Sequence, residues 1–150
     1  HCSDQIVPVK QFRPATGSYT LEFPAGLIDA DPHQSVPPCT QTWETEEGAA
    51  VRELKEECGF AGIATGKSVP LTVSPGMSNE SDVAVIVEVD MALPENKNPV
   101  QKLDDGEFCE VVKLDKNNLL AELQKHASEG VQILCGLHCF AVGLALAQQS

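Results

Sequence analysis

Three glutamates lie close together near the end of one predicted helix. Residues 45–58 contain many strong helix formers, and Gly59 follows where a glycine commonly ends a helix. Glu53, Glu56 and Glu57 fall in the last turns, where the negative end of the helix dipole disfavours carboxylates. Glu53 and Glu57 are also four residues apart, a spacing at which like charges repel each other. A bound cation would remove both sources of instability.

The helical period places two of these carboxylates beside the buried face. Glu53 and Glu57 lie about 40° apart on one edge of that face, and Glu56 lies further toward solvent. Arg52 and Lys55 are expected to point elsewhere. Clustered carboxylate oxygens at a half-buried edge suit a hard divalent cation such as Mg²⁺. The alternative is a solvated acidic face, which is common on surface helices. The predicted buried stripe consists of Ala50, Val51, Leu54 and Cys58.

Strands and two further helices are expected around this helix. The clearest strand is 82–91, because Val83, Val85, Val87 and Val89 fall on one face. The fold class predicted is α/β (α+β), with a mixed sheet covered by helices on both faces. Segment 31–43 has three prolines, no hydrophobic period and the chain's one tryptophan, and it predicts a long loop. The other predicted strands are 4–14, 19–23, 62–65, 68–73 and 107–114, and the other helices are 116–127 and 136–149.

Length and charge limit the kinds of partner. The 150 residues suit a single domain. The net charge of −12 excludes binding to nucleic acid or to an anionic membrane through general electrostatics. An anionic substrate would need a bridging cation or a few well-placed basic residues. The apolar stretch FAVGLALA is too short to span a membrane.

The six cysteines are interpreted mainly as reduced thiols. Cys58 lies on the helical stripe and Cys109 in a predicted strand, so both are expected to be buried. Cys135 and Cys139, with His138 between them, are an alternative metal site, but no second pair has zinc-ligand spacing. A reducing compartment is therefore expected.

The order of residues along the acidic helix resembles the signature of the Nudix hydrolases. That signature has Arg-Glu, an aliphatic residue, any residue, Glu-Glu, any residue and Gly. A glutamate eight residues before the arginine is also expected, and Glu44 stands there. The first glycine of the signature would fall at Pro38, so Gly26 is its displaced counterpart and 31–43 resembles an insertion. The matching residues are Arg52, Glu53, Leu54, Glu56, Glu57, Gly59 and Phe60.

The flanking segments resemble one branch of this family, the ADP-sugar pyrophosphatases. These segments are VKQFRP, EFPAGLID, SPGMSNE and DDGEF, and Pro75 stands fifteen residues beyond Phe60, as that branch requires. The resemblance implies a Nudix fold that hydrolyses ADP-ribose and related ADP-sugars to AMP and a sugar phosphate. It implies Mg²⁺ as the cofactor, with Mn²⁺ as a substitute.

The resemblance also assigns roles to individual residues. Glu107 would activate water, and Arg52 and Glu56 would complete the catalytic group, with Arg52 paired to Glu44. Arg13 would meet the diphosphate or the terminal ribose, although an exposed strand-end arginine is the alternative. The remaining substrate-binding residues would be Glu22, Gly76, Met77 and Ser78, and the metal ligands would be Glu53, Glu57, Glu56 and the carbonyl of Ala25. Each of these also has a structural alternative, such as a strand charge or an ordinary turn.

Relatives in this branch carry an N-terminal region that swaps between subunits and binds adenine. The chain is therefore expected to be an N-terminally truncated Nudix domain, 1–150, lacking its first strands. The resemblance implies a homodimer for the full-length protein and a cytoplasmic location, with the nucleus as an alternative. A catalytically weak nucleotide-binding or scaffold protein is the alternative function, as is hydrolysis of another nucleoside diphosphate substrate.

Overall fold

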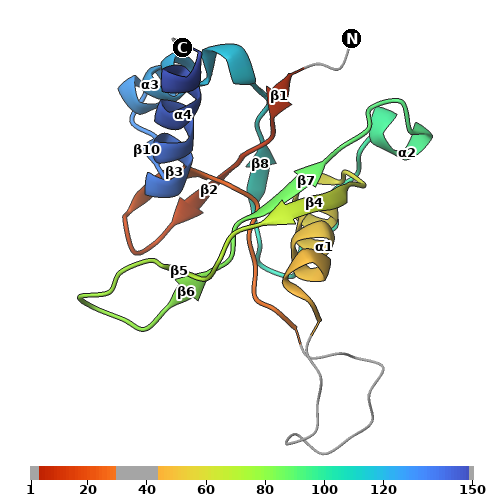
Figure 1. Ribbon diagram of the computed structural model, residues 1–150, viewed down its shortest axis with the longest axis horizontal. Coiled ribbons are helices and arrows are strands. Elements are labelled where there is room, and N and C mark those ends of the chain that lie inside the picture. Colours follow the sequence, from red (N-terminus) through yellow and green to blue (C-terminus); the bar gives the residue numbers. More distant parts are fainter. Residues whose placement is uncertain (1–3, 30–43, 149–150) are drawn as a thin grey trace, which may run out of the picture. The chain divides into compact units, whose positions relative to one another are not determined.

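The computed structural model describes residues 4–29 and 44–148 of the chain (Figure 1). The chain divides into two compact units, the first formed by residues 1–24 and 102–150 and the second by residues 25–101. Mixed sheet and helices together make an α+β fold, as predicted. The predicted insertion at 31–43, including Trp43, lies outside the described residues.

The first unit contains a four-stranded mixed sheet. Its strand order is β10 (Gln132–Ile133), β3 (Ser18–Glu22), β2 (Val9–Arg13) and β8 (Cys109–Val111). β3 runs parallel to β10 and antiparallel to β2, which is antiparallel to β8. A separate antiparallel pair joins β1 (Gln5–Ile6) to β9 (Leu114–Asp115). Pro8 has no N–H for a ladder, so the strand predicted at 4–14 is divided in two.

Two helices enclose the core of the first unit. A short 3₁₀ turn, η2 (Lys116–Asn118), leads into α3 (Leu119–Ser128), and α4 (Cys135–Ala147) follows β10. α3 and α4 lie side by side (Figure 1). The predicted helix at 116–127 thus begins as a 3₁₀ turn, and the one predicted at 136–149 starts one residue earlier. The core cluster consists of Leu21, Leu114, Leu119, Leu123, Val131, Leu137 and Ala141.

The second unit packs α1 (Glu46–Cys58) against a hairpin of β4 (Ile63–Lys67) and β7 (Val85–Glu88). The side chain of Thr45 accepts a hydrogen bond from the N–H of Gly48 and caps the start of α1. Gly59, with φ 76°, ends the helix in the left-handed conformation. The buried residues of α1 are Ala49, Leu54, Glu57 and Cys58, whereas the predicted Ala50 and Val51 are only half-buried.

The valine-rich strand alternates as predicted but is shorter. Val83, Val85, Val87 and Val89 are half-buried, and the residues between them are exposed. Only Val85–Glu88 pairs with β4; a second short pair, β5 (Leu71–Thr72) with β6 (Ser81–Asp82), continues the hairpin. No helix among the described residues has the length and hydropathy to cross a membrane.

Asn96 joins α2 (Pro94–Lys97) to the chain that leaves α1. Its side chain is fully buried. The amide nitrogen donates to the carbonyls of Ala61 and Asp90, at 2.8 and 2.9 Å, and the amide oxygen accepts from the N–H of Ala61 at 2.7 Å. Two of these bonds hold the segment between α1 and β4, and the third holds the chain that follows β7. The sequence pattern predicted neither α2 nor this contact.

Candidate active site

Arg52 lies at the centre of the acidic cluster on α1. Its Nη1 donates to Glu53 at 2.7 Å and to Glu56 at 3.0 Å. Its Nη2 donates to Glu44 at 2.6 Å and to the carbonyl of Leu27 at 2.9 Å. The expected contact with Glu44 is confirmed. The expectation that Arg52 points away from the other carboxylates is wrong, because its long side chain reaches back to them.

These ion pairs fix the charge states of the arginine and of its main partner. Hydrogen bonds from Arg52 lower the pKa of the Glu44 carboxyl, with a further bond from the N–H of Asp29. The bond to Glu44 is also the largest cause that raises the pKa of Arg52 above its ordinary value. Arg52 therefore carries the positive charge that the neighbouring carboxylates need.

Glu57 is the buried carboxylate of this cluster. It is only 2% exposed, and its Oε2 accepts a hydrogen bond from the N–H of Ala25 at 3.1 Å. The next residue, Gly26, packs so tightly on α1 that a Cβ there would overlap the carboxylate of Glu53. A glycine is required because the backbone approaches these carboxylates closely. The segment at Ala25 and Gly26 is thus held against the acidic edge of α1.

Gln101 fixes the other end of the same helical turn. Its Nε2 donates to the backbone carbonyl of Glu57 at 2.6 Å. That carbonyl is among the last four of α1, which have no partner within the helix. Gly59 packs against the backbone of Val100, so a side chain at Gly59 would collide with it. The segment 100–101 therefore supports the turn that carries Glu56 and Glu57.

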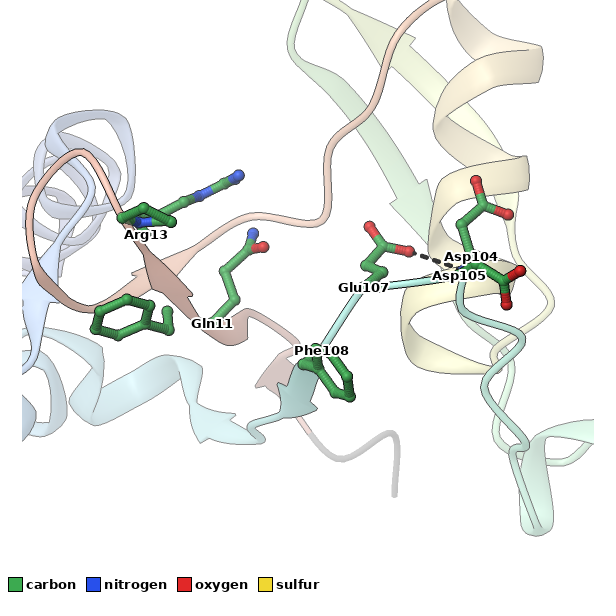
Figure 2. A pocket seen from close by; sticks show the side chains of 9 residues that line it. Gln11, Arg13, Asp104, Asp105, Glu107 and Phe108 are labelled. Carbon is green, nitrogen blue, oxygen red and sulfur yellow. Dashed lines mark hydrogen bonds between the residues drawn. The ribbon is translucent and has the colours of Figure 1, made fainter.

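The first unit contains an open pocket of about 520 Å³. Figure 2 shows Gln11 and Arg13 reaching it from β2, and Asp104, Asp105, Glu107 and Phe108 from the segment before β8. Glu107 is held by a hydrogen bond that the N–H of Asp104 donates at 3.2 Å. The pocket therefore presents one guanidinium and several carboxylates beside aromatic rings. Its lining residues are Gln11, Phe12, Arg13, Pro14, Asp104, Asp105, Gly106, Glu107 and Phe108.

Arg13 and Glu22 form a two-pronged ion pair across β2 and β3. The guanidinium Nε and Nη2 donate to the two carboxylate oxygens at 2.9 and 2.8 Å. Thr20 donates a further hydrogen bond to Glu22. The bond from Arg13 is the main cause that lowers the pKa of Glu22, against the opposing effect of burial. Glu22 is 12% exposed and Arg13 45%, so the carboxylate positions a guanidinium that stays accessible at the pocket.

Comparison with known proteins assigns the family. The family model described as the NUDIX domain matches residues 2–133. The matched region includes the Arg52 cluster and the pocket residues of the first unit. The chain belongs to the Nudix family.

Several Nudix relatives carry informative names. The chain is 38% identical to the ADP-ribose pyrophosphatase of Saccharomyces cerevisiae, over 97% of this chain and 58% of that protein. It is 39% identical to the ADP-sugar pyrophosphatase of Mus musculus, over 94% of this chain and 59% of that protein. The chain is 30% identical to the ADP-ribose pyrophosphatase of Bacillus subtilis, over 77% of this chain and 54% of that protein. The chain therefore spans less than two thirds of the length of these relatives.

The donor set on the Nudix helix fits a hard divalent cation. Glu53, Glu56 and Glu57 offer carboxylate oxygens, and the close approach at Gly26 brings the backbone of Ala25 to the same edge. Within the described ranges, no three acidic, cysteine or histidine side chains stand together in ligating positions. Arg52 binds two of the three carboxylates.

The turn between β5 and β6 carries Gly76, Met77 and Ser78. Met77 is 93% exposed, and the N–H groups of Met77 and Ser78 both donate to the carbonyl of Ser74. An added Cβ at Gly76 would meet no atom within 4 Å. These residues therefore form an open turn, and their contact with a sugar stays a prediction.

Sequence reasoning missed three groups around the Nudix helix. The carbonyl of Leu27 and the side chain of Asp29 both face Arg52, with the Asp29 carboxylate 3.6 Å from Nη2. These two groups could have been predicted, because they lie in EFPAGLID, one of the segments that resemble the ADP-sugar pyrophosphatases. Gln101 carried no local signal, since only the fold brings it to Glu57.

Proposed function

We propose that this chain hydrolyses the diphosphate of ADP-ribose and related ADP-sugars to AMP and a sugar phosphate. The observation that carries the proposal is the cluster in which Arg52 joins Glu44, Glu53 and Glu56 beside the buried Glu57. Its support comes from the Nudix match and from the names of the yeast and mouse relatives.

The proposed cofactor is Mg²⁺, with Mn²⁺ as a substitute. Its ligands would be Glu53, Glu56, Glu57 and the carbonyl of Ala25. When bound, the ion supplies positive charge to the diphosphate oxygens and polarises the phosphoryl group. Glu57 would act from a fixed position, because Ala25 binds its carboxylate and Gln101 binds its carbonyl. Arg52 would keep Glu53 and Glu56 on one side of the helix.

The proposed substrate contacts follow the pocket of the first unit. Arg13 would bind the diphosphate or the terminal ribose, held in place by Glu22. Glu107 would orient a water molecule and accept its proton as the water oxygen attacks phosphorus. The P–O bond to the leaving phosphate breaks in the same displacement, so no covalent enzyme intermediate forms. Gly76, Met77 and Ser78 would cover the sugar.

Assembly and location are part of the same proposal. We infer a homodimer for the full-length protein and a cytoplasmic location, with the nucleus as an alternative. Light scattering measures the mass of the full-length protein in solution, and the mass of a dimer is expected. Imaging of a tagged full-length protein measures its location.

Product analysis tests the proposed reaction. The chain is incubated with ADP-ribose and Mg²⁺, and the products are separated by chromatography. AMP and ribose 5-phosphate are expected in equal amounts, and other nucleoside diphosphate sugars should also be hydrolysed, because the adenine-binding N-terminal region of the branch is expected to be missing. Binding of ADP-ribose without any AMP would contradict hydrolysis and favour a catalytically weak nucleotide-binding protein. Equal rates with Mg²⁺ and with excess EDTA would contradict the metal assignment.

A further inference from the structure

Two cysteines lie side by side on the exposed face of α4. Cys135 and Cys139 are both exposed, and their Sγ atoms are 4.0 Å apart. Their spacing of four residues places them on one helical face, opposite Leu137 and Ala141 in the core. A disulfide bond is only about 2.05 Å long, so both residues are present as thiols.

The distance between these sulfurs fits two ligands of one tetrahedral metal ion. A Zn–S bond of about 2.3 Å, with a tetrahedral angle at the metal, separates two sulfur ligands by roughly 3.8 Å. A larger soft ion such as Cd²⁺ requires a slightly longer separation. The observed distance of 4.0 Å between the two Sγ atoms matches these separations, so the helix does not have to change for an ion to bind. Hard ions such as Mg²⁺ prefer oxygen ligands and would not select this pair.

The surroundings of the pair leave room for an ion. Gly136 and Gly143 lie on one side of the two sulfurs along α4, and an added Cβ at either would meet no atom within 4 Å. Cys135 is the first residue of α4, and Cys139 lies one turn further along the helix. The two sulfurs already face each other at 4.0 Å, so an ion can bridge them without a change of the backbone.

We propose that Cys135 and Cys139 form a binding site for one thiophilic divalent cation of the Zn²⁺ and Cd²⁺ class. Each thiol releases its proton to solvent as its sulfur bonds to the ion, so binding of one ion releases up to two protons. Water fills the remaining tetrahedral positions. The site uses soft sulfur ligands, and it is therefore chemically distinct from the carboxylates on α1.

A cadmium titration tests this site. Cd²⁺ is added to the reduced chain in the presence of excess Mg²⁺, which occupies the oxygen-ligand sites. The ultraviolet charge-transfer absorption of the cadmium–thiolate bond reports binding at sulfur. A plateau at one ion per chain is expected. Cys135→Ser and Cys139→Ser should each weaken the binding by about tenfold or more.

Cys109→Ser is the matched control, because it removes a thiol on β8 of the same unit. It should leave the absorption and the affinity unchanged, and circular dichroism should show the same fold for all variants. Absence of the absorption would overturn the proposal, as would an affinity that survives either substitution on α4. The readout does not involve ADP-ribose, so failure of the proposed hydrolase function leaves this test intact.

Discussion

Arg52 offsets the repulsion among the carboxylates of α1. Glu53 and Glu56 each receive a hydrogen bond from its Nη1, at the helix end where carboxylates are least stable. A metal ion bound to the same carboxylates would supply the same positive charge. Arg52 therefore has its largest effect on stability when no metal is bound.

Arg52→Gln should lower the free energy of unfolding by about 2 kcal/mol in EDTA, because charge-assisted hydrogen bonds are lost. Saturating Mg²⁺ should recover most of that loss, since the ion neutralises the same carboxylates. Thermal melts in EDTA and in Mg²⁺ measure both values. Lys67→Gln is the control, because Lys67 pairs with Glu46 and Glu47 at the other end of α1. If Arg52→Gln lowers the free energy of unfolding equally in EDTA and in Mg²⁺, then Arg52 and the metal do not neutralise the same carboxylates.

The pair formed by Arg13 and Glu22 should make stability depend on pH. The folded-state pKa of Glu22 is lowered below its ordinary value of 4.5, chiefly by Arg13, so the ionised form is stabilised by folding. That stability is fully present above 4.5 and is lost as pH falls through the lowered folded value. Glu22→Gln should therefore lower the melting temperature at pH 7, and its deficit should shrink in acid.

Melting temperatures of the wild type and of Glu22→Gln between pH 7 and pH 3 measure this effect. At neutral pH the loss should be about 1 to 3 kcal/mol, as for hydrogen bonds to charged groups. Glu110→Gln is a suitable control, because the Glu110 side chain is 70% exposed and lies 3.5 Å from Lys10. A deficit that stays constant down to pH 3 would show that the ion pair does not stabilise the fold.

The contact between two elements, the segment 25–28 and α1, depends on Gly26. Here the backbone comes close to the carboxylate of Glu53. A Cβ at Gly26 would displace the carboxylate of Glu53, the flexible end of a side chain, so Gly26→Ala should keep the fold. Metal affinity should nevertheless fall by about 10- to 100-fold, as when a group that orients a ligand is lost. Calorimetric titration with Mn²⁺ measures it. Gly66→Ala is the control, because a Cβ there meets only Ile86 at 3.7 Å, an ordinary contact. Unchanged affinity for Gly26→Ala would contradict the role of this approach.

Asn96 should contribute strongly to the stability of the second unit. Asn96→Ala removes three hydrogen bonds and leaves the half-buried backbone N–H and carbonyl of Ala61, and the carbonyl of Asp90, without this partner. We expect a loss of about 2 to 4 kcal/mol, since each unsatisfied buried group costs about 1 to 3 kcal/mol. Urea unfolding measures it, with Asn98→Ala, an exposed residue of the same segment, as the control. A loss no larger than that of the control would refute the role of Asn96.

Elements with local signals were predictable from the sequence, and those formed by distant contacts were not. α1 has a helical period and a terminal glycine, and the strand at Val85 has a strict alternation, so each pattern lies within one segment. β10 has two residues, and its pairing with β3 joins parts of the chain over a hundred residues apart. Periodicity places a Cα on a face, but it does not say where a long side chain such as Arg52 ends. Gln101 was missed for the same reason, because only the tertiary fold brings it to Glu57.

At the scale of the whole molecule, charge explains why the proposed reaction needs a cation. The chain carries a net charge of −12, and a diphosphate would bring more negative charge to it. The chain has only two arginines, and each forms an ion pair with a glutamate of its own unit. The matched NUDIX region, residues 2–133, contains both pairs. The proposed hydrolysis therefore depends most on a metal bound by the carboxylates of α1.

Hydrolysis of ADP-ribose by Glu57→Gln in Mg²⁺ tests that claim most directly. Glutamine keeps the size of Glu57 and an oxygen to accept the Ala25 N–H, so the fold should be retained. Glu47→Gln removes a carboxylate from the first turn of the same helix and serves as the control. The rate of AMP release should fall by at least about a hundredfold for Glu57→Gln, beyond the loss expected for an outer-shell group. It should stay near wild type for Glu47→Gln. An unchanged rate for a folded Glu57→Gln variant would contradict the claim.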